Sequence, residues 1–316
     1  MVEIFTIGDA MITLNPATKG PMRFVESFHR KVGGAELNFA IGCARLGLRT
    51  GWISRLGNDE FGRHIQNFVR GEGIDITQVK LVEGYPTSVN FKEIMEDGTG
   101  QTFYYRANSP TSTLSPDDLT EELFKNAKIL HITGVFPAVR EQNFEIILKA
   151  VELAKKLHVR ISFDPNIRLK LWRKEQAILK LSQLLPFVDI ILTGEDEAEL
   201  LFGVKEPKLI IEACRKYGIS HIAIKRGAHG SIGYHNGVYV EAPPAKARKV
   251  VDTVGAGDGF DAGFVYGVIN NWPLEKTLEF ANTIGSMVVS VSGDNEGLPY
   301  LEDVLIQMGE RVFIER

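Results

Sequence analysis

The sequence predicts an α/β protein whose central sheet is doubly wound, mostly parallel and flanked by helices. Short apolar segments typical of buried strands alternate with longer segments of helical spacing over most of the 316 residues. Strands of this length with helices between them form βαβ units, whose strands pair in parallel. Two segments depart from the alternation, and they predict a small second sheet.

The expected elements follow one another along the chain. Strand-like runs occupy residues 2–9, 49–57, 127–134, 159–166, 188–195 and 220–227. Helical spacing of apolar residues occurs at 35–48, 59–73, 142–158, 174–187 and 206–218. A helix therefore follows or precedes every predicted strand, as a doubly wound sheet requires.

The two exceptions are residues 10–32 and 85–107, which alternate like strands and contain turn sequences such as "EDGTG". We expect these segments to pair as a small β-sheet lid that stands off the main sheet. No repeat, low-complexity tract or linker divides the chain, so residues 1–316 are predicted to form one domain with this lid.

Charge and composition restrict the function classes. The formal net charge of −4 argues against a nucleic acid or a membrane as partner, since both attract basic surfaces. The two cysteines, Cys43 and Cys214, exclude a disulfide scaffold and a cysteine-rich zinc site. The first residues alternate like a strand, not like a signal peptide, and no apolar stretch is long enough to span a bilayer. We therefore expect a cytoplasmic protein.

The stretch "DTVGAGDGFDAGF", residues 252–264, places four glycines and three aspartates at the start of a helical segment. A helix N-terminus presents free N–H groups to anions, and glycines let the backbone approach phosphate oxygens closely. Residues 255–257 therefore predict an anion cradle, followed directly by Asp258. In one interpretation Asp258 complements the helix dipole and Asp252 caps the helix. In the other, Asp258 is a general base that accepts a proton from a hydroxyl attacking a phosphate.

Several segments resemble, in order, the ribokinase-like (pfkB) family of carbohydrate kinases. Residues 252–264 are similar to the family's C-terminal signature, and residues 32–47 with 54–65 are similar to its N-terminal signature. Further similarity occurs at residues 192–203, 222–234 and 281–297. The resemblance implies a ribokinase-like fold, ATP and Mg²⁺ as cofactors, and a homo-oligomer formed through the lid. It leaves open whether a monovalent cation is also needed.

The resemblance assigns the phosphoryl-transfer residues. It implies that Asp258 is the catalytic base, and that Gly255, Ala256 and Gly257 supply backbone N–H groups to the phosphoryl charge. Thr253 is expected near the nucleotide phosphates.

Sugar contacts are implied for Gly33, Gly34, Asn38 and Asp9. The alternative for the glycines is a plain tight turn leading into a helix. Asn38 fits that alternative less well, because asparagine is a mediocre helix former.

The nucleotide contacts implied by the resemblance are Lys225, Gly227, Gly230 and Asn282. A glycine hairpin is the alternative for the loop at 225–230. Relatives often have Asn-x-x-Glu where this chain has Gly194 and Glu197, so Glu197 is expected to act near Mg²⁺ through water. The glycine departs from that pattern.

Two arginines point to an acidic sugar. Arg106 ends a lid segment and Arg168 follows a predicted central strand, and an arginine binds a planar carboxylate bidentately. The alternative for each is a surface ion pair. Together with Tyr104 and Asp294 they resemble the sugar-acid contacts of 2-keto-3-deoxygluconate kinases in this family. Those kinases often carry a tyrosine at the position of Asn90, which is also expected to face the sugar.

The predicted reaction is phosphorylation of the primary hydroxyl of 2-keto-3-deoxygluconate by ATP to give the 6-phosphate. A fructokinase, or another pfkB-family sugar kinase, is the nearest alternative. A nucleoside kinase fits the lid arginine less well, and a sugar-sensing relative without catalysis would be expected to lack Asp258.

Overall fold

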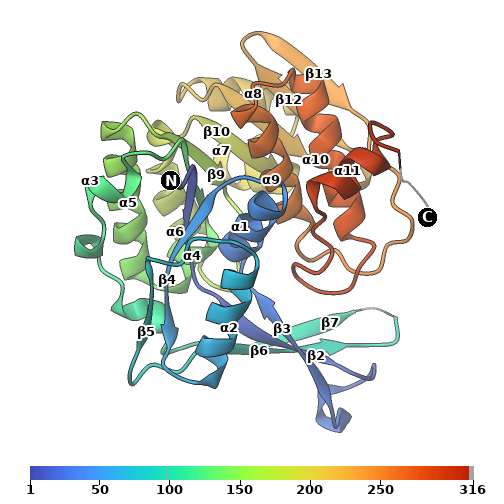
Figure 1. The fold of residues 1–316 in the computed structure, drawn as a ribbon. Coiled ribbons are helices and arrows are strands. Elements are labelled where there is room, and N and C mark those ends of the chain that lie inside the picture. Colours follow the sequence, from blue (N-terminus) through green and yellow to red (C-terminus); the bar gives the residue numbers. More distant parts are fainter. Residues whose placement is uncertain (98, 313–316) are drawn as a thin grey trace.

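The structure, a computed structural model, describes residues 1–97 and 99–312 and contains two β-sheets of different size (Figure 1). The large sheet has nine strands in the order β13-β12-β11-β10-β9-β8-β1-β4-β5. Its strands are β1 (Ile4–Ile7), β4 (Thr50–Gly57), β5 (Val79–Val82), β8 (Ile129–Thr133), β9 (Arg160–Asp164), β10 (Ile190–Gly194), β11 (His221–Lys225), β12 (Ser231–His235) and β13 (Val238–Ala242).

The large sheet is parallel from β5 to β11, and β12 and β13 add an antiparallel hairpin at one edge. The chain runs from β1 outward to β4 and β5, then returns to β8 on the other side of β1. Strand order therefore reverses between β1 and β8, and ligands bind at such a switch point beyond the carboxyl ends of the strands. The doubly wound fold expected from the sequence is confirmed.

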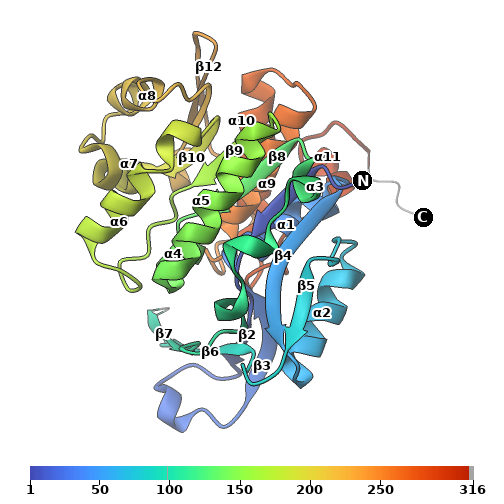
Figure 2. The same ribbon diagram turned by 90° about the vertical axis from the view of Figure 1, so that its left-hand side faces the viewer.

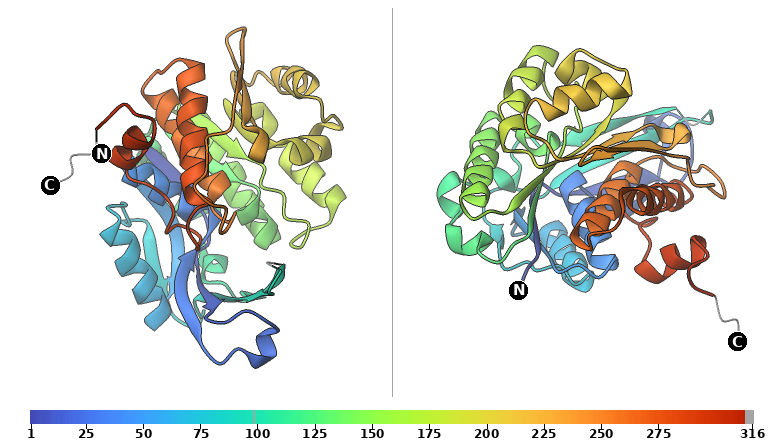
Figure 3. Two further views of the ribbon diagram at one scale, coloured as in Figure 1. Left: turned by 90° about the vertical axis from the view of Figure 1, so that its right-hand side faces the viewer. Right: turned by 90° about the horizontal axis from the view of Figure 1, so that it is seen from above.

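Helices cover both faces of this sheet (Figure 3). One face carries α3 (Glu121–Phe124), α4 (Val135–Val139), α5 (Glu141–Lys156), α6 (Lys174–Ser182), α7 (Glu195–Phe202) and α8 (Pro207–Arg215). The other carries α1 (Ala35–Arg45), α2 (Glu60–Gly71), α9 (Ala256–Ile269), α10 (Leu274–Val288) and α11 (Leu301–Gln307). Short 3-10 turns lie at Met22–Phe24, Pro110–Thr113, Pro116–Asp118, Leu185–Phe187 and Gly227–His229.

Two hydrophobic cores form because successive strand residues point to opposite faces. In β10, Ile191 joins the core beneath α5, whereas Ile190 and Leu192 join the core beneath α9 and α10. All three side chains are fully buried. A strand buried on both faces reads as a continuous apolar run, which is why the central strands could be recognised from sequence.

The predicted helix at 174–187 is shorter in the structure, where α6 ends at Ser182. Leu185–Phe187 form a separate 3-10 turn with Pro186 at its start. Proline has no backbone N–H to continue an α-helix and clashes with the preceding turn.

The small sheet contains β2 (Met11–Pro16), β3 (Phe28–Gly33), β6 (Ser88–Ile94) and β7 (Gly100–Tyr105) in the order β3-β2-β6-β7. Its central pair, β2 and β6, is parallel, and both outer pairs are antiparallel. It stands off the large sheet as a lid, with β7 projecting away from the body of the molecule (Figure 2). The predicted lid segments contain these four strands except for Gly33, one residue beyond the first segment.

No helix among residues 1–97 and 99–312 combines the length and the apolar character needed to cross a membrane.

Helices α9 and α10 approach each other closely at Gly263, and this contact yields a stability prediction. A Cβ atom at Gly263 would lie 2.8 Å from Ile284 Cδ1 and 3.0 Å from the backbone Cα of Ala281. We expect Gly263→Ala to lower the free energy of unfolding by about 1–3 kcal/mol, because overpacking forces the helices apart.

The matched control is Gly71→Ala at the exposed end of α2, where an added Cβ would meet nothing within 4 Å. This variant should be neutral or stabilised by up to about 1 kcal/mol, since alanine is the better helix former. Urea unfolding measures both, and equal effects of the two substitutions would contradict the close approach.

Candidate active site

A cavity of about 810 Å³ lies between the carboxyl ends of the large-sheet strands and the lid. Its walls come from the turn after β1, the ends of β9 and β11, the starts of α1 and α9, and strands β6 and β7. Most residues singled out in the sequence line it. They are Asp9, Gly34, Asn38, Asn90, Tyr104, Arg106, Arg168, Glu197, Lys225, Thr253, Gly255, Gly257, Asp258 and Asp294.

The turn into α9 depends on Gly255, which has a φ of 78°. A Cβ at this position would lie 2.0 Å from the backbone oxygen of Asp294. Only glycine combines this left-handed conformation with so close an approach of a second backbone. The turn therefore places Asp258 in the first turn of α9, directly at the cavity.

Asp258 is almost completely buried, and Asn38 Nδ2 donates a hydrogen bond of 2.8 Å to its Oδ2. Burial raises the pKa of Asp258 from 3.8 to about 7, against the lowering effect of the Asn38 hydrogen bond. The nearby Asp164 carboxylate raises it further, while Lys225 and Arg168 lower it. A carboxyl group with this pKa can exchange a proton near neutral pH, as a general base must.

Asn38 thus lies beside Asp258 as well as lining the cavity. The sequence indicated a sugar contact for Asn38 and gave no sign of this hydrogen bond, because the two residues are 220 positions apart.

Glu36 is a buried carboxyl group at the cavity that the sequence analysis missed. Its Oε1 accepts hydrogen bonds from Thr133 Oγ1 at 2.5 Å and from the backbone N–H of Phe136 at 3.1 Å. Burial raises the pKa of Glu36 to about 7, and the Asp258 carboxylate adds to the rise. A glutamate in the first turn of a helix usually only complements the dipole, so its type alone carried no signal.

Lys225 ends β11 and points inward rather than along the loop that follows it. Its ammonium group lies 3.1 Å from Asp164 Oδ1 and 3.2 Å from Asp261 Oδ1, both fully buried carboxylates. These carboxylates raise the pKa of Lys225 despite its burial. The same nitrogen lies 3.8 Å from the position that a Cβ at Gly257 would occupy. A fixed positive charge therefore lies beside the predicted anion cradle at residues 255–257.

The lid side of the cavity contains polar groups without partners. Asp9 Oδ1, Asn90 Oδ1 and Arg106 Nη2 are buried atoms with no hydrogen-bond partner within the described part of the chain. The Arg106 guanidinium lies over the Tyr104 ring, 5.2 Å from its centre. Buried polar groups are nearly always paired, so two acceptors and a cationic donor here indicate a ligand with hydroxyl and anionic groups.

Asp294 forms a partly buried ion pair with the lid, since its Oδ1 lies 2.5 Å from Lys92 Nζ. A second pair joins Lys31 of β3 to Glu296 at 2.8 Å. Gly33 does not line the cavity. It makes room for the loop that carries Asp294, because a Cβ at Gly33 would lie 2.3 Å from Asp294 Oδ2. Lys92 was not singled out from the sequence, where lysine on a strand is typical of a solvated face.

Glu197 is held by backbone groups on both sides. Its Oε2 accepts from Gly194 N at 2.9 Å and its Oε1 accepts from Ile167 N at 3.0 Å. Burial raises the pKa of Glu197, and Asp164 adds to the rise. Gly194 caps α7 and takes no part in the cavity lining.

The remaining predicted nucleotide residues lie outside this cavity. Asn282 Nδ2 donates to the backbone oxygens of Ala242 and Pro243, at 3.4 and 3.0 Å. Gly230 packs against the same Ala242 carbonyl, which a Cβ would approach to 2.2 Å. The predicted residues outside the cavity lining are Gly33, Ala256, Gly227, Gly230 and Asn282.

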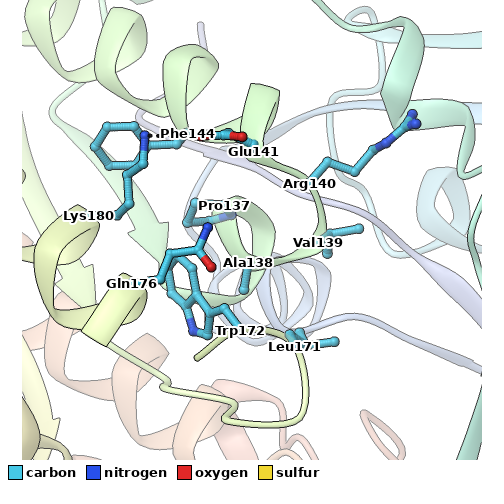
Figure 4. Close-up of a pocket in the computed structure, with 10 residues that line it drawn as sticks. All are labelled: Pro137, Ala138, Val139, Arg140, Glu141, Phe144, Leu171, Trp172, Gln176 and Lys180. Atoms are coloured by element: carbon cyan, nitrogen blue, oxygen red, sulfur yellow. Dashed lines mark ion pairs between the residues drawn. The ribbon is translucent and has the colours of Figure 1, made fainter. Parts of the chain in front are cut away.

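A smaller cavity of about 210 Å³ opens between α4, α5 and α6 (Figure 4). It shares Val139 and Leu171 with the large cavity. The Lys180 ammonium group lies over the Phe144 ring at 4.7 Å and 3.8 Å from Glu141. None of the residues singled out in the sequence lines it.

Within the described residues, no group of three or more histidine, cysteine, aspartate or glutamate side chains is arranged to hold a metal ion directly.

Comparison with known proteins agrees with this geometry. The family model described as "pfkB family carbohydrate kinase" matches residues 1–301. The chain is 34% identical to a 2-dehydro-3-deoxygluconokinase of Thermoproteus tenax, over 95% of this chain and 92% of that one. It is 30% identical to a 5-dehydro-2-deoxygluconokinase of Bacillus subtilis (strain 168), over 96% and 94%.

Among solved structures, the chain resembles a protein described as a putative ribokinase II from E. coli in complex with ATP and Mg²⁺. The TM-score is 0.89 at 26% sequence identity, with 98% of this chain and 100% of that chain covered. The ribokinase-like fold and the ATP-dependent sugar kinase expected from the sequence are thereby confirmed. The chain belongs to the pfkB family of carbohydrate kinases.

Proposed function

We propose that the protein transfers the γ-phosphoryl group of ATP to the primary hydroxyl of 2-keto-3-deoxygluconate, giving the 6-phosphate and ADP. The observation that carries this proposal is that Asp258 shares one cavity with Arg106 and Arg168. One sugar acid in this cavity could therefore meet Asp258 with its hydroxyl end and the two arginines with its carboxylate end. The name borne by the Thermoproteus tenax relative supports the same substrate.

In this mechanism Asp258 accepts the proton of the 6-hydroxyl as its oxygen attacks the γ-phosphorus. One O–P bond forms and the bond from the γ-phosphorus to the bridging oxygen of ADP breaks. Asn38 holds the carboxylate of Asp258 toward the hydroxyl by its 2.8 Å hydrogen bond. The backbone amides of residues 255–257 and the N-terminus of α9 stabilise the charge on the transferring group.

ATP would be bound by Thr253 and Lys225 at the cavity, and by Gly227, Gly230 and Asn282 beyond it. Mg²⁺ bound with ATP would neutralise phosphate charge, with Glu197 as the residue that holds it through water. Glu197 suits this indirect role, because each of its oxygens already accepts a backbone hydrogen bond. An ATP-consuming kinase of this kind would work in the cytoplasm.

The sugar acid would be bound from both sides of the cavity. Arg106 and Arg168 would pair with its carboxylate, and Asp9, Asn90 and Gly34 would contact its hydroxyl groups. Asp294 and Tyr104 would complete the wall of the sugar-acid site. The unpartnered oxygens of Asp9 and Asn90 would accept hydroxyl protons, and Arg106 Nη2 would donate to the carboxylate.

Asp258→Asn tests the base. We expect kcat to fall about a hundred- to ten-thousandfold, because asparagine cannot take up the proton. In the wild type, kcat/KM should decline below about pH 7, since burial raises the pKa of Asp258 to about 7 and the base must be ionised. The pH at which kcat/KM declines, the acid limb of the pH profile, depends on the charged groups that act on Asp258. These are Glu36, Asp164, Asp261, Lys225 and Arg168. A coupled ADP assay measures both, and unchanged turnover would refute the mechanism.

Thermal stability shows that the variant is folded. The folded-state pKa of Asp258 lies above its ordinary value of 3.8, so the stability that its protonation contributes is lost as pH rises through about 7. Asp258→Asn removes that loss, and its Tm should exceed the wild-type Tm at about pH 8. The difference should shrink as the pH falls toward about 5.

Arg168→Gln tests whether Arg168 pairs with the carboxylate of the sugar acid. We expect kcat/KM for 2-keto-3-deoxygluconate to fall about ten- to a hundredfold, because a charged hydrogen bond to the carboxylate is lost. The value for neutral fructose should change much less. Arg173→Gln is the matched control, since Arg173 is exposed and does not line the cavity.

The same assay compares 2-keto-3-deoxygluconate, 5-keto-2-deoxygluconate and fructose. Faster turnover of fructose than of either acid would overturn the sugar-acid assignment in favour of a fructokinase.

We also propose that two copies of the chain associate through the lid. Phe91 contacts Phe28 and Tyr105 edge-to-face on the side of the lid away from the cavity, at ring distances of 5.3 and 5.7 Å. Phe103 and Tyr105 are 36% and 64% exposed. Aromatic side chains on a sheet with two open edges, β3 and β7, suit pairing with a second copy.

A double variant Phe103→Glu and Tyr105→Glu should convert the dimer to a monomer, because two buried charges would lose their hydration. Light scattering measures the mass in solution. Tyr239→Glu, at a tyrosine 38% exposed on β13, is the control and should leave the mass unchanged. A wild-type monomer at micromolar concentration would contradict the proposal.

A further inference from the structure

Asn295 follows Asp294 in the loop that crosses the back of the active site, and it is 2% exposed. It does not line the cavity, and its side-chain hydrogen bonds go to Val32 and Asn38, not to Asp258. Its side-chain amide nevertheless reaches Asn38, the residue that donates a hydrogen bond to Asp258.

The amide orientation of Asn295 is fixed by the backbone. Its Nδ2 donates to the carbonyl oxygen of Val32 at 2.6 Å. A carbonyl oxygen can only accept, so the NH₂ end and not the oxygen end must face Val32. The same Nδ2 lies 3.4 Å from Asn38 Oδ1, a longer hydrogen bond that uses its second proton.

This contact fixes the orientation of Asn38 in turn. An amide that accepts from Asn295 with its oxygen must present its NH₂ group on the other side, where Asp258 lies. Asn38 Nδ2 donates there at 2.8 Å to Asp258 Oδ2. If the Asn38 amide were flipped, its carbonyl oxygen would face the carboxylate, and two acceptors would oppose each other.

The loop that carries Asn295 is itself anchored. Arg45 Nη1 donates to the backbone oxygens of Asn295 and Leu298, at 2.8 and 2.7 Å. The guanidinium of Arg45 is paired with Glu72, its Nε donating at 2.9 Å. On the other side, Asp294 pairs with Lys92 of the lid. Asn295 therefore has a fixed position from which to act.

We infer that Asn295 is a positioning residue for the catalytic base: it selects the amide orientation of Asn38 that donates a hydrogen bond to Asp258. This inference rests on the proposed function, in which Asp258 is the base. The donated hydrogen bond favours the ionised carboxylate, so its loss makes the base harder to ionise. Glu36, Asp164, Asp261, Lys225 and Arg168 also face Asp258, and the substitutions below leave them in place.

The test is Asn295→Leu, which removes both donors at similar volume, and Asn295→Asp, which keeps the shape but replaces the amide with an acceptor. Rates with MgATP and the best sugar acid are measured from about pH 5.5 to 9. In both variants we expect kcat at neutral pH to fall by on the order of tenfold, as for one lost hydrogen bond to a charged group. The acid limb should move up by about half to one pH unit. The sugar KM should change less than kcat, because Asn295 does not line the cavity and acts on it only through Asn38.

Thr277→Val is the matched control. Thr277 is 2% exposed and does not line the cavity, and its Oγ1 donates to the backbone oxygen of Pro273 at 3.0 Å. Loss of this hydrogen bond should destabilise the fold without moving the acid limb. If the acid limb of the pH profile shifts equally in the control, the shift comes from losing any buried hydrogen bond, and the inference is overturned.

Two outcomes separate this inference from the proposed function. If Asp258→Asn is inactive but both Asn295 variants keep the wild-type limb, the positioning role is wrong and the base assignment stands. If Asp258→Asn keeps wild-type turnover, the base assignment fails and the positioning role fails with it.

Discussion

The close approach of two backbones at Gly255 determines the geometry of the whole active site. Gly255 lies in a left-handed conformation with the carbonyl of Asp294 where a side chain would otherwise be. Because the two segments touch there, α9 begins at the cavity and the 293–297 loop crosses directly behind it. Any larger residue would separate them, and Asp258 would move away from Asn38. One missing side chain thus aligns Asp258, which is the proposed base, with the predicted anion cradle at residues 255–257 and the loop that meets the lid.

Burial of charge is the second constraint on this site. Asp164, Asp258 and Asp261 are buried close to the ammonium group of Lys225, and Glu197 lies partly buried beside them. Burial without a full set of counter-charges raises the pKa of Asp258 and Glu36 to about 7. Such an arrangement lowers stability at high pH. It also gives a carboxylate basic enough to take a proton from a hydroxyl at neutral pH, which an exposed aspartate is not.

In the proposed function, the lid supplies residues that would distinguish one sugar from another. Family membership fixes the fold and the use of ATP, but the same fold serves many alcohols. Here the lid contributes Asn90 and Arg106, each of which has one buried polar atom, Oδ1 and Nη2 respectively, with no partner within residues 1–97 and 99–312. Lys92, although also cationic, is occupied by Asp294 and connects the lid to the loop behind the base. This ion pair therefore joins the lid, which carries the proposed sugar contacts, to the loop next to the proposed base.

The sequence by itself determined the alternation of strands and helices, the two lid segments, the glycine turn at 255–257 and the family. These are local patterns, since buried strands, helical faces and close backbone turns each leave a mark within a short window. Most of the site residues that it indicated also line the cavity. Only the tertiary structure decided which of them meet. Asn38 and Asp258 are 220 positions apart, and Asn295 lies 257 positions from Asn38. No local pattern records such pairings, and the burial that raises the pKa of Glu36 exists only once the two sides of the cavity have come together.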